Sequence, residues 1–332
     1  MSGRRFVVIG AGSIGRRHAK NLVALGAGTV TVCDPDPAAC ETAVREIGCA
    51  AVTGLDAALA PGPDAVLVCT PTHLHLPAAR AAIAAGAHVF MEKPIAESLD
   101  GVADLVAAAR AARRMLLVGC NMRFHPGVAA LKHALDEGTP RVPPCFRARF
   151  SHYLPNWRPG SDYRNSYSAR RAHGGGIVLE GVHEIDYVRW MAGEVSSVSA
   201  WAGHLSTLDI DSEDCALVEL SCKSGATAQI HLDYLSPLKL RGCEIIGEDA
   251  VLRWASEGKT PERVRVTRYR NGAEEETLLA LDAYDGNAMY LEELRHFLAC
   301  LDGTETPQLD GEQAYRVLEL ALAARDAADR RP

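Results

Sequence analysis

The stretch RFVVIGAGSIG, residues 5–15, decides the fold of the first part of this 332-residue chain. It places the pattern Gly10-Ala11-Gly12-Ser13-Ile14-Gly15 directly after an apolar strand and at the start of a helical segment. Glycines at these spacings allow a tight turn, let the backbone approach a pyrophosphate and let helix and strand pack closely. The start of the helix would offer N–H groups and a positive dipole end to the phosphates. The stretch therefore predicts a dinucleotide-binding turn; a glycine-rich turn without a ligand is the alternative.

An acidic residue follows where such a turn needs one. Asp34 ends the second strand, TVTVCD, 19 residues after Gly15, where its carboxylate can accept hydrogen bonds from the adenosine ribose. A carboxylate there repels a 2′-phosphate, and Asp36 adds a second acid. We therefore expect NAD as cofactor, while two arginines on the first helix, Arg16 and Arg17, leave NADP open. The residues expected to bind it here are Gly10, Gly12, Ser13, Ile14, Gly15 and Asp34.

The first third of the chain alternates short apolar strands with alanine-rich helices. The strand candidates are RFVVIG, TVTVCD, AVLVCT, HVFMEK and MLLVGC, and the helical stretches are 15–25, 37–47, 77–85 and 99–113. Unalternating apolar runs are typical of parallel strands covered on both faces, and strand–helix alternation implies right-handed crossovers. Residues 1–121 are therefore predicted to form an α/β domain, a Rossmann-type doubly wound parallel sheet.

The pattern changes after Asn121. A helix is predicted at 125–138, a long loop rich in Arg and Tyr at 151–176, and closing helices near 290–301 and 311–328. Strands with period-two alternation are predicted in VSSVSAWAGH, CALVELSCKSGATAQIHLDYL, LRGCEIIGEDAVLRW and RVRVTRYR. Residues 122–332 are thus predicted to form an α+β domain with a large, mostly antiparallel, open-faced sheet. Apolar residues on that open face would favour a homodimer or homotetramer.

Composition excludes several classes of function. The 35 basic and 42 acidic residues give a net charge of −7, which offers no general attraction to nucleic acid or anionic lipid. No apolar run approaches the roughly 18 residues of a membrane span, and no signal peptide is predicted. The ten cysteines form no C-x-x-C pair, which is typical of reduced thiols in the cytoplasm and not of a disulfide framework or zinc site. We expect a cytoplasmic protein without nucleic-acid or membrane partners.

Two further motifs carry titratable groups. Lys93, in Glu92-Lys93-Pro94, follows a predicted parallel strand, where such sheets bind ligands, and it is one of only six lysines beside 29 arginines. A lysine retained there suggests a titratable ammonium or a compact donor, with a surface lysine as the alternative. In GGGIVLEGVHEID, residues 174–186, the side chains of Glu180, His183 and Asp186 would share one helix face.

A histidine beside a carboxylate can exchange a proton with a substrate hydroxyl. A buried, satisfied histidine and a metal site of histidine and carboxylates are the alternatives at His183. A metal is unnecessary where a nicotinamide carries out the chemistry, so none is expected.

Several segments, taken in order, resemble the Gfo/Idh/MocA oxidoreductases, which include glucose–fructose oxidoreductase and inositol dehydrogenases. They are GAGSIGRRH, CTPTHLHLPAARAAIAAGAHVFMEKP, GCNMRFHP, the GGG–Glu–His–Asp segment and DGEQA. The resemblance implies a Rossmann domain, a C-terminal domain with an open sheet, and reversible oxidation of hydroxyls on sugars, cyclitols or sugar nucleotides. It matches Lys93 to the family's active-site lysine and His183 to its catalytic histidine.

The chain departs from the family at one position. Many members have Asp four residues before the histidine, where this chain has Leu179; the nearest acid, Glu180, lies three before and becomes the third catalytic candidate. Further cofactor contacts are expected at Thr70, Pro71, His75, Glu92, Lys93 and Asn121.

The expected reaction moves a hydride between a substrate carbon and nicotinamide C4, while His183 exchanges the hydroxyl proton and Lys93 polarises the same oxygen. The substrate-binding candidates are Lys93, Arg123, Tyr153, Trp157, Arg158, Tyr163, Arg164, Tyr167 and His183. The arginines of the long loop favour an anionic, carbohydrate-like substrate, with a subunit contact or flexible flap as the alternative. NAD-dependent glycoside cleavage by transient oxidation and a non-catalytic NAD-binding regulator are the other functions left open.

Overall fold

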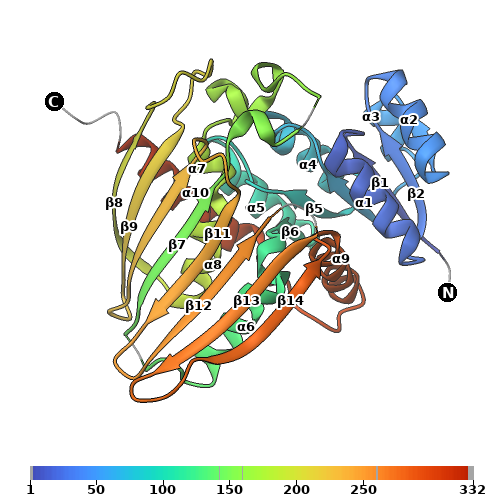
Figure 1. The fold of residues 1–332 in the computed structure, drawn as a ribbon. Helices are drawn as coiled ribbons and strands as arrows, with labels where there is room; N and C mark the ends of the chain where they lie inside the picture. The colour runs from blue at the N-terminus through green and yellow to red at the C-terminus, as the bar shows by residue number, and fades with distance from the viewer. Residues whose placement is uncertain (1–2, 142, 159, 259–260, 328–332) are drawn as a thin grey trace. The chain divides into compact units, whose positions relative to one another are not determined.

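The computed structural model describes residues 3–141, 143–158, 160–258 and 261–327 (Figure 1). The chain divides into two compact units, which we call the first and second unit. The first comprises Met1–Cys120 with Tyr290–Leu318, and the second Asn121–Met289 with Glu319–Pro332. The division at 121/122 expected from the sequence puts Tyr290–Leu318 in the second part. In the structure this segment belongs to the first unit, because Leu294 and Phe297 complete its apolar core.

The described part of the first unit contains a six-stranded parallel sheet with the order β3-β2-β1-β4-β5-β6. Its strands are β1 (Arg4–Ile9), β2 (Gly28–Cys33), β3 (Ala50–Val52), β4 (Ala65–Val68), β5 (His88–Glu92) and β6 (Leu116–Gly119). The predicted doubly wound parallel sheet is confirmed. The sequence missed β3, because a three-residue strand at the sheet edge gives no apolar run. The strand order reverses between β1 and β4, and ligands bind at the carboxyl ends of strands at such a point.

Helices of the first unit follow the predicted stretches. They are α1 (Ser13–Ala24), α2 (Pro37–Ile47), α3 (Leu55–Leu59), α4 (His75–Ala84), α5 (Val102–Ala111) and α9 (Asn287–Leu301), with the short η1 (Thr72–Leu74) before α4. The predictions at 15–25, 37–47, 77–85 and 99–113 are confirmed as α1, α2, α4 and α5, whereas the short α3 was missed. The closing helix α10 (Gly311–Asp326) was predicted to reach Ala328, which lies outside the described residues.

The described part of the second unit contains an eight-stranded sheet with the order β14-β13-β12-β11-β7-β10-β9-β8. Its strands are β7 (Cys145–Ser151), β8 (Val195–Gly203), β9 (Cys215–Cys222), β10 (Thr227–Asp233), β11 (Leu240–Ile246), β12 (Ala250–Glu257), β13 (Glu262–Arg270) and β14 (Glu276–Tyr284). The predicted, mostly antiparallel sheet is confirmed: β7 and β10 run parallel, and the other described pairs run antiparallel. The sequence missed β7 and β14.

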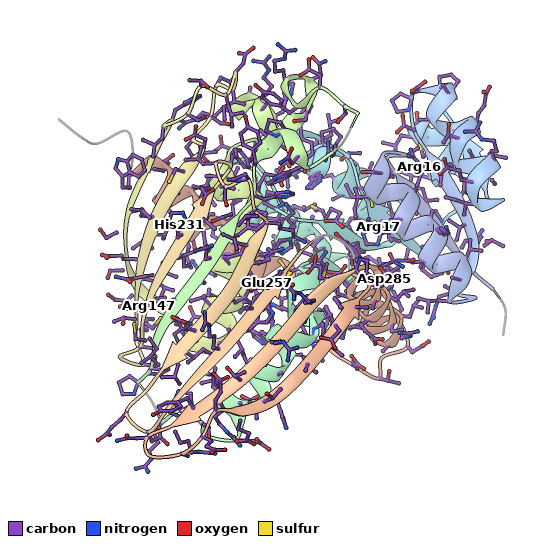
Figure 2. The ribbon with its side chains drawn as sticks, in the orientation of Figure 1. Arg16, Arg17, Arg147, His231, Glu257 and Asp285 are labelled. Carbon is purple, nitrogen blue, oxygen red and sulfur yellow. The ribbon has the colours of Figure 1, made fainter. Side chains whose placement is uncertain are left out.

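One face of this sheet is covered and the other is open. The covering helices are α6 (Pro126–Asp136), α7 (Ile177–Glu180) and α8 (Val182–Ala192), and η2 (Asn121–Phe124) precedes them. A hollow of about 600 Å³ on the sheet is lined by Arg147, Arg149, Glu219, His231, Arg253 and Glu257 among others. Figure 2 labels Arg147, His231 and Glu257 along the sheet. The open face therefore mixes charged and apolar residues. Leu217 on it is 48% exposed, but Arg147 and Arg149 on β7 and Glu219 on β9 interrupt the expected apolar patch.

Candidate functional site

The glycine-rich turn between β1 and α1 leaves no room for side chains at two positions. Gly10 has φ +101°, and a Cβ on it would lie 2.6 Å from the carbonyl oxygen of Cys69. A Cβ on Gly15 would lie 1.8 Å from the carbonyl oxygen of Gly10. Around Gly12, by contrast, no atom of the described residues comes within 4 Å of a built Cβ. The turn is therefore closely packed against β4 on one side and open at Gly12.

Asp34 holds this turn from the end of β2. Its Oδ2 accepts a hydrogen bond of 2.7 Å from the backbone N–H of Ala11, and its Oδ1 accepts one of 2.9 Å from Asp36. The helix α1 begins at Ser13, and its N-cap Gly12 has no side chain to cap it. The first N–H groups of a helix have no partner within the helix, so this end can bind a phosphate.

The arginines that left NADP open have partners within the first unit. Arg16 donates to the carbonyl oxygen of Ala11 at 2.6 Å, and its Nε lies 3.2 Å from a carboxylate oxygen of Glu46. The guanidinium carbon of Arg17 lies 4.6 Å from the centre of the Tyr290 ring. Asp34 and Arg16 therefore both bind the backbone of Ala11 in the turn, Asp34 at its N–H and Arg16 at its carbonyl oxygen.

Lys93 follows β5 directly and is half-buried. The Oε1 atom of the preceding Glu92 lies 2.7 Å from His18 Nε2, and its Oε2 accepts a hydrogen bond of 3.2 Å from the backbone N–H of Lys93. Glu92 was expected to contact the cofactor. In the structure both of its carboxylate oxygens have partners inside the first unit, so Glu92 supports the local geometry around Lys93.

His75 connects the loops that follow β4 and β5. Its Nδ1 lies 2.8 Å from the carbonyl oxygen of Pro94, and its Nε2 lies 2.9 Å from that of Thr70. The side chain is buried, and burial lowers the pKa of His75. A neutral imidazole has one donor, so it donates to one of these carbonyls at a time. Of the three candidates in this segment, Pro71 is exposed, Thr70 is half-buried, and His75 is turned toward the protein backbone.

The GGG segment does not form the continuous helix that the spacing suggested. The helix α7 ends at Glu180 and α8 begins at Val182, with Gly181 between them. A Cβ on Gly181 would lie 2.8 Å from the Leu232 side chain, so tight packing on β10 accompanies the break. Glu180 and His183 therefore belong to separate helices, and the prediction of one shared helix face was wrong.

The surroundings of the acid/base candidates differ. Ser168 donates a hydrogen bond of 2.7 Å to Glu180 Oε1, and both residues are buried. Leu179, at the position where many family members have Asp, is fully buried. His183 lies in the first turn of α8 and is 7% exposed.

Asp186 forms an ion pair with Arg123. Its two carboxylate oxygens accept hydrogen bonds of 2.8 Å and 2.6 Å from Nε and Nη2 of Arg123. Both side chains are buried, and the guanidinium carbon lies 5.1 Å from the Trp190 ring centre. Two nitrogens of the Arg123 guanidinium are used in this buried pair, and its expected contact with the substrate stays a prediction. Asn121, at the start of η2, is also buried.

The long loop at 151–176 contains the four short turns η3 (Leu154–Asn156), η4 (Tyr163–Asn165), η5 (Tyr167–Ala169) and η6 (Arg171–His173) in its described part, from which Pro159 is excluded. Trp157 anchors it: the indole donates to the carbonyl oxygen of His152 at 3.0 Å, and its ring centre lies 5.2 Å from that of Tyr234. Trp157 is therefore half-buried and held within the second unit by these contacts, and its expected contact with the substrate stays a prediction.

The remaining loop candidates divide by their partners. Arg164 forms hydrogen bonds with Asp162, and the hydroxyl of Tyr163 accepts one of 3.1 Å from the backbone N–H of Asp209. Arg158 is exposed, and its guanidinium carbon lies 5.6 Å from the Tyr167 ring centre. Tyr153 is half-buried. The positive charge available to an anionic substrate is thus smaller than the count of arginines suggested.

His18 and Glu293 both interact with Glu92, and neither was predicted from the sequence to have a role. His18 lies on α1 and bonds Glu92, while Glu293 lies on α9 beside Leu294 and four residues before Phe297, two core residues. An acid on the apolar side of a helix is the signal that could have identified Glu293.

The described residues contain neither a metal-binding cluster nor a membrane-spanning helix. No group of three or more His, Cys, Asp or Glu side chains among them has the arrangement of a metal site. No helix within those residues combines the length and apolar character needed to cross a membrane.

The reversed strand order, the open glycine turn and the acid at the end of β2 define a dinucleotide-binding Rossmann protein. Residues 4–120 match the family model described as "Oxidoreductase family, NAD-binding Rossmann fold", and residues 128–253 match the GFO/IDH/MocA C-terminal domain. The chain belongs to the Gfo/Idh/MocA oxidoreductase family, which confirms the resemblance seen in the sequence.

Similar proteins cover most of the chain. A 1,5-anhydro-D-fructose reductase of Ensifer adhaerens is 30% identical, over 81% of this chain and 78% of that protein. An inositol 2-dehydrogenase of Pseudomonas savastanoi pv. phaseolicola is also 30% identical, over 96% and 91%. The solved structure of a levoglucosan dehydrogenase in complex with NADH covers 98% of this chain and 97% of its own, with a TM-score of 0.85 and 19% identity, and shares its fold.

Proposed function

We propose that this protein is an NAD-dependent dehydrogenase or ketoreductase acting on a secondary hydroxyl or keto group of a sugar, cyclitol or sugar nucleotide. The observation that carries the proposal is the place of Lys93 at the carboxyl end of β5, in the same sheet edge as the turn after β1. A cation there can act on a ligand bound at the point where the strand order reverses. The names of the relatives, an anhydrofructose reductase and inositol dehydrogenases, support the substrate class.

The residues of the first unit fit NAD. Gly10 and Gly15 keep the backbone close to β4, Gly12 is open, and the start of α1 can bind the pyrophosphate. Asp34 supports NAD over NADP because its carboxylate lies on the turn, while Arg16 is held by the Ala11 carbonyl and Glu46, and Arg17 lies over the Tyr290 ring. When bound, NAD supplies the carbon that accepts or returns the hydride.

The side chains of the protein move the proton. In the oxidative direction His183 accepts the proton of the substrate hydroxyl, and in the reductive direction it returns it. Lys93 donates a hydrogen bond to the same oxygen and stabilises negative charge that develops there. Glu180, held by Ser168, supplies a fixed carboxylate three residues before His183.

We further propose that copies of this chain associate through the open face of the eight-stranded sheet. That face carries both signs of charge, with Arg147, Arg149 and Arg253 beside Glu219 and Glu257, and a two-fold interface can pair a surface with itself. Light scattering at micromolar concentration should give more than the 35.6 kDa of one chain; a monomer in low salt would contradict this. The ten cysteines, all of them described residues, form no disulfide with one another, which supports a reducing compartment, the cytoplasm.

A substrate screen tests the proposed activity. Sugars, cyclitols and sugar nucleotides are incubated with the protein and NAD, and their keto forms with NADH, while absorbance reports NADH. Net NADH formation or consumption with one compound class is expected. A glycoside cleaved without net NADH would instead establish cleavage by transient oxidation, and NAD binding without turnover of any compound would favour a regulator.

A further inference from the structure

Two carboxyl groups of the first unit, those of Glu92 and Glu293, are largely buried and interact electrostatically. Glu92, at the end of β5, has a side chain only 12% exposed, and Glu293, on α9, is 1% exposed. Both oxygens of Glu92 accept hydrogen bonds, whereas neither oxygen of Glu293 has a hydrogen-bond partner among the described residues. The surrounding residues therefore stabilise a charged carboxylate at Glu92 by hydrogen bonds but not at Glu293.

The pKa values of these two acids are shifted in opposite directions. Burial, followed by the charge of Glu92, raises the pKa of Glu293 well above its ordinary value. Burial alone would raise the pKa of Glu92 too, but the hydrogen bond and charge of His18, together with Lys93, outweigh it and lower that pKa. Burial and a neighbouring like charge both disfavour a second ionised carboxylate, so we expect the negative charge to lie on Glu92, the acid that has hydrogen-bond donors.

His18 is the group that distinguishes the two acids. It lies on α1, three residues after Gly15, and is fully buried. Its ring lies edge-on to Phe90 and Tyr290, with ring centres 5.1 Å and 5.8 Å apart, which fixes the direction of the imidazole. The other titratable or charged groups that act on this cluster are Arg17, Cys69, His75 and Tyr290. The hydrogen bond of 2.7 Å to the Glu92 side chain comes from His18 and not from these four groups.

We propose that His18 is a positioning residue for Lys93: by bonding Glu92 and not Glu293, it fixes the single negative charge of the acid pair on the residue that precedes Lys93. This inference rests on the proposed function, in which Lys93 acts on the substrate oxygen, and it adds the residue that sets the charge next to Lys93. Without a donor at position 18, Glu92 takes up a proton. The ammonium form of Lys93 then loses a neighbouring opposite charge and is less favoured.

The titration of Lys93 tests this directly and needs no substrate. The lysines of the protein are reductively methylated with [13C]formaldehyde, and because there are only six, few resonances appear in the NMR spectrum. Lys93→Arg assigns the Lys93 signal by its loss. His18→Leu removes the donor, His18→Gln keeps an N–H donor on a side chain of similar reach, and Leu22→Ala is the matched control because Leu22 is fully buried on α1.

We expect His18→Leu to lower the titration midpoint of Lys93 by about one pH unit. His18→Gln should restore at least half of that shift, and Leu22→Ala should leave the midpoint where it is. An unchanged midpoint in His18→Leu, or an equal shift in Leu22→Ala, would overturn the proposal. If His18→Leu does not fold, Glu92→Gln replaces it, since it removes the same charge at nearly constant shape; an unchanged midpoint there is equally contradictory.

Activity measurements separate this inference from the proposed function. If Lys93→Met keeps its rate on the substrate found in the screen, the catalytic role of Lys93 is wrong, whatever the titration shows. If Lys93→Met is inactive but His18→Leu leaves both the Lys93 midpoint and the pH profile of kcat unchanged, only the role of His18 is wrong. On the alkaline side of the kcat profile, we expect activity to fall at a lower pH in His18→Leu than in the parent protein. The profile of His18→Gln should lie between the two.

Discussion

Asp34 and Ala11 are joined by a hydrogen bond of 2.7 Å between the carboxylate Oδ2 and the backbone N–H. The acid that ends β2 therefore holds the glycine turn that leaves β1. An aspartate at this place also meets the adenosine ribose in dinucleotide-binding folds. Asp34 therefore fixes the geometry of the turn, and we expect the choice of cofactor to depend on the same side chain.

Replacing Asp34 with Ala should reduce the preference for NAD. We expect the parent protein to bind NAD at least about tenfold more tightly than NADP, because the carboxylate repels a 2′-phosphate. Asp34→Ala removes that repulsion and leaves the Ala11 N–H without this acceptor. The affinity for NAD should therefore fall, and the difference in affinity between NAD and NADP should narrow. Calorimetric titration with each cofactor measures the two dissociation constants.

The matched control is Asp36→Ala. Asp36 caps α2 by accepting a hydrogen bond of 3.0 Å from the N–H of Ala38, so its loss should cost about 1 kcal/mol of stability and narrow the preference for NAD less than Asp34→Ala does. Equal or tighter NADP binding by the parent protein would show that Asp34 does not decide the cofactor.

Gly15→Ala and Gly12→Ala should have separable effects. An alanine Cβ at Gly15 would overlap the carbonyl oxygen of Gly10, so the turn must shift, at a cost of about 1–3 kcal/mol of unfolding free energy and with weaker NAD binding. At Gly12 a Cβ meets open space, so Gly12→Ala should weaken NAD binding without lowering the melting temperature. Thermal melts with and without NAD distinguish the two. A normal melting temperature for Gly15→Ala would refute the close packing described here.

The buried pair of Arg123 and Asp186 should be essential for stability. Asp186→Leu leaves the Arg123 charge buried without its carboxylate, and breaking such pairs costs about 3–5 kcal/mol. The double variant Arg123→Met with Asp186→Leu should recover most of this loss. Urea unfolding measures both, with the exposed pair of Arg263 and Glu257 as control, where Arg263→Gln should cost less than about 1 kcal/mol. A loss no greater than the control's would mean that the pair is not buried in solution.

Stability should fall in acid partly through Asp233. Burial would raise the pKa of this carboxyl, but hydrogen bonds from His231, Ser151 and two backbone N–H groups lower it to about 2 from an ordinary 3.8. A lowered folded-state pKa adds stability that is complete above about pH 4 and is lost as the pH falls toward 2. Asp233→Asn should therefore cost about 2 kcal/mol at pH 6 and progressively less below pH 4. A cost that does not change with pH would contradict this.

The sequence predicted the fold where apolar runs were long. The strands around Val8, Leu67 and Phe90 are fully buried and gave clear runs, whereas β3 is three residues long and has no such run. In β7, Phe146 and Phe150 face the core, but Arg147 and Arg149 between them gave the segment a polar composition, and its alternation went unused. That α9 belongs to the first unit follows from the packing of Leu294 and Phe297 in its core, and such packing cannot be predicted from local composition.

The candidate site was predicted in its local motifs and not in its long-range partners. The turn at Gly10 and the position of Lys93 after a strand follow from neighbouring residues. The pairing of Glu92 with His18 spans 74 residues, and that of Arg123 with Asp186 spans 63, so spacing could not reveal either. The break at Gly181 was missed because the helical spacing of Glu180 and His183 assumed that one helix contains both.

The central claim is that Lys93 and His183 act on the reacting oxygen while the first unit binds NAD. The most direct measurement is kcat of Lys93→Met and His183→Asn on the substrate from the screen, together with the NAD dissociation constant of each variant. Loss of one positioned proton-transfer group lowers rates about 10²–10⁴-fold, so each variant should lose activity by that order and keep its NAD affinity. If either variant retains more than about half of the parent kcat, against that 10²–10⁴-fold expectation, its residue does not act on the reacting oxygen.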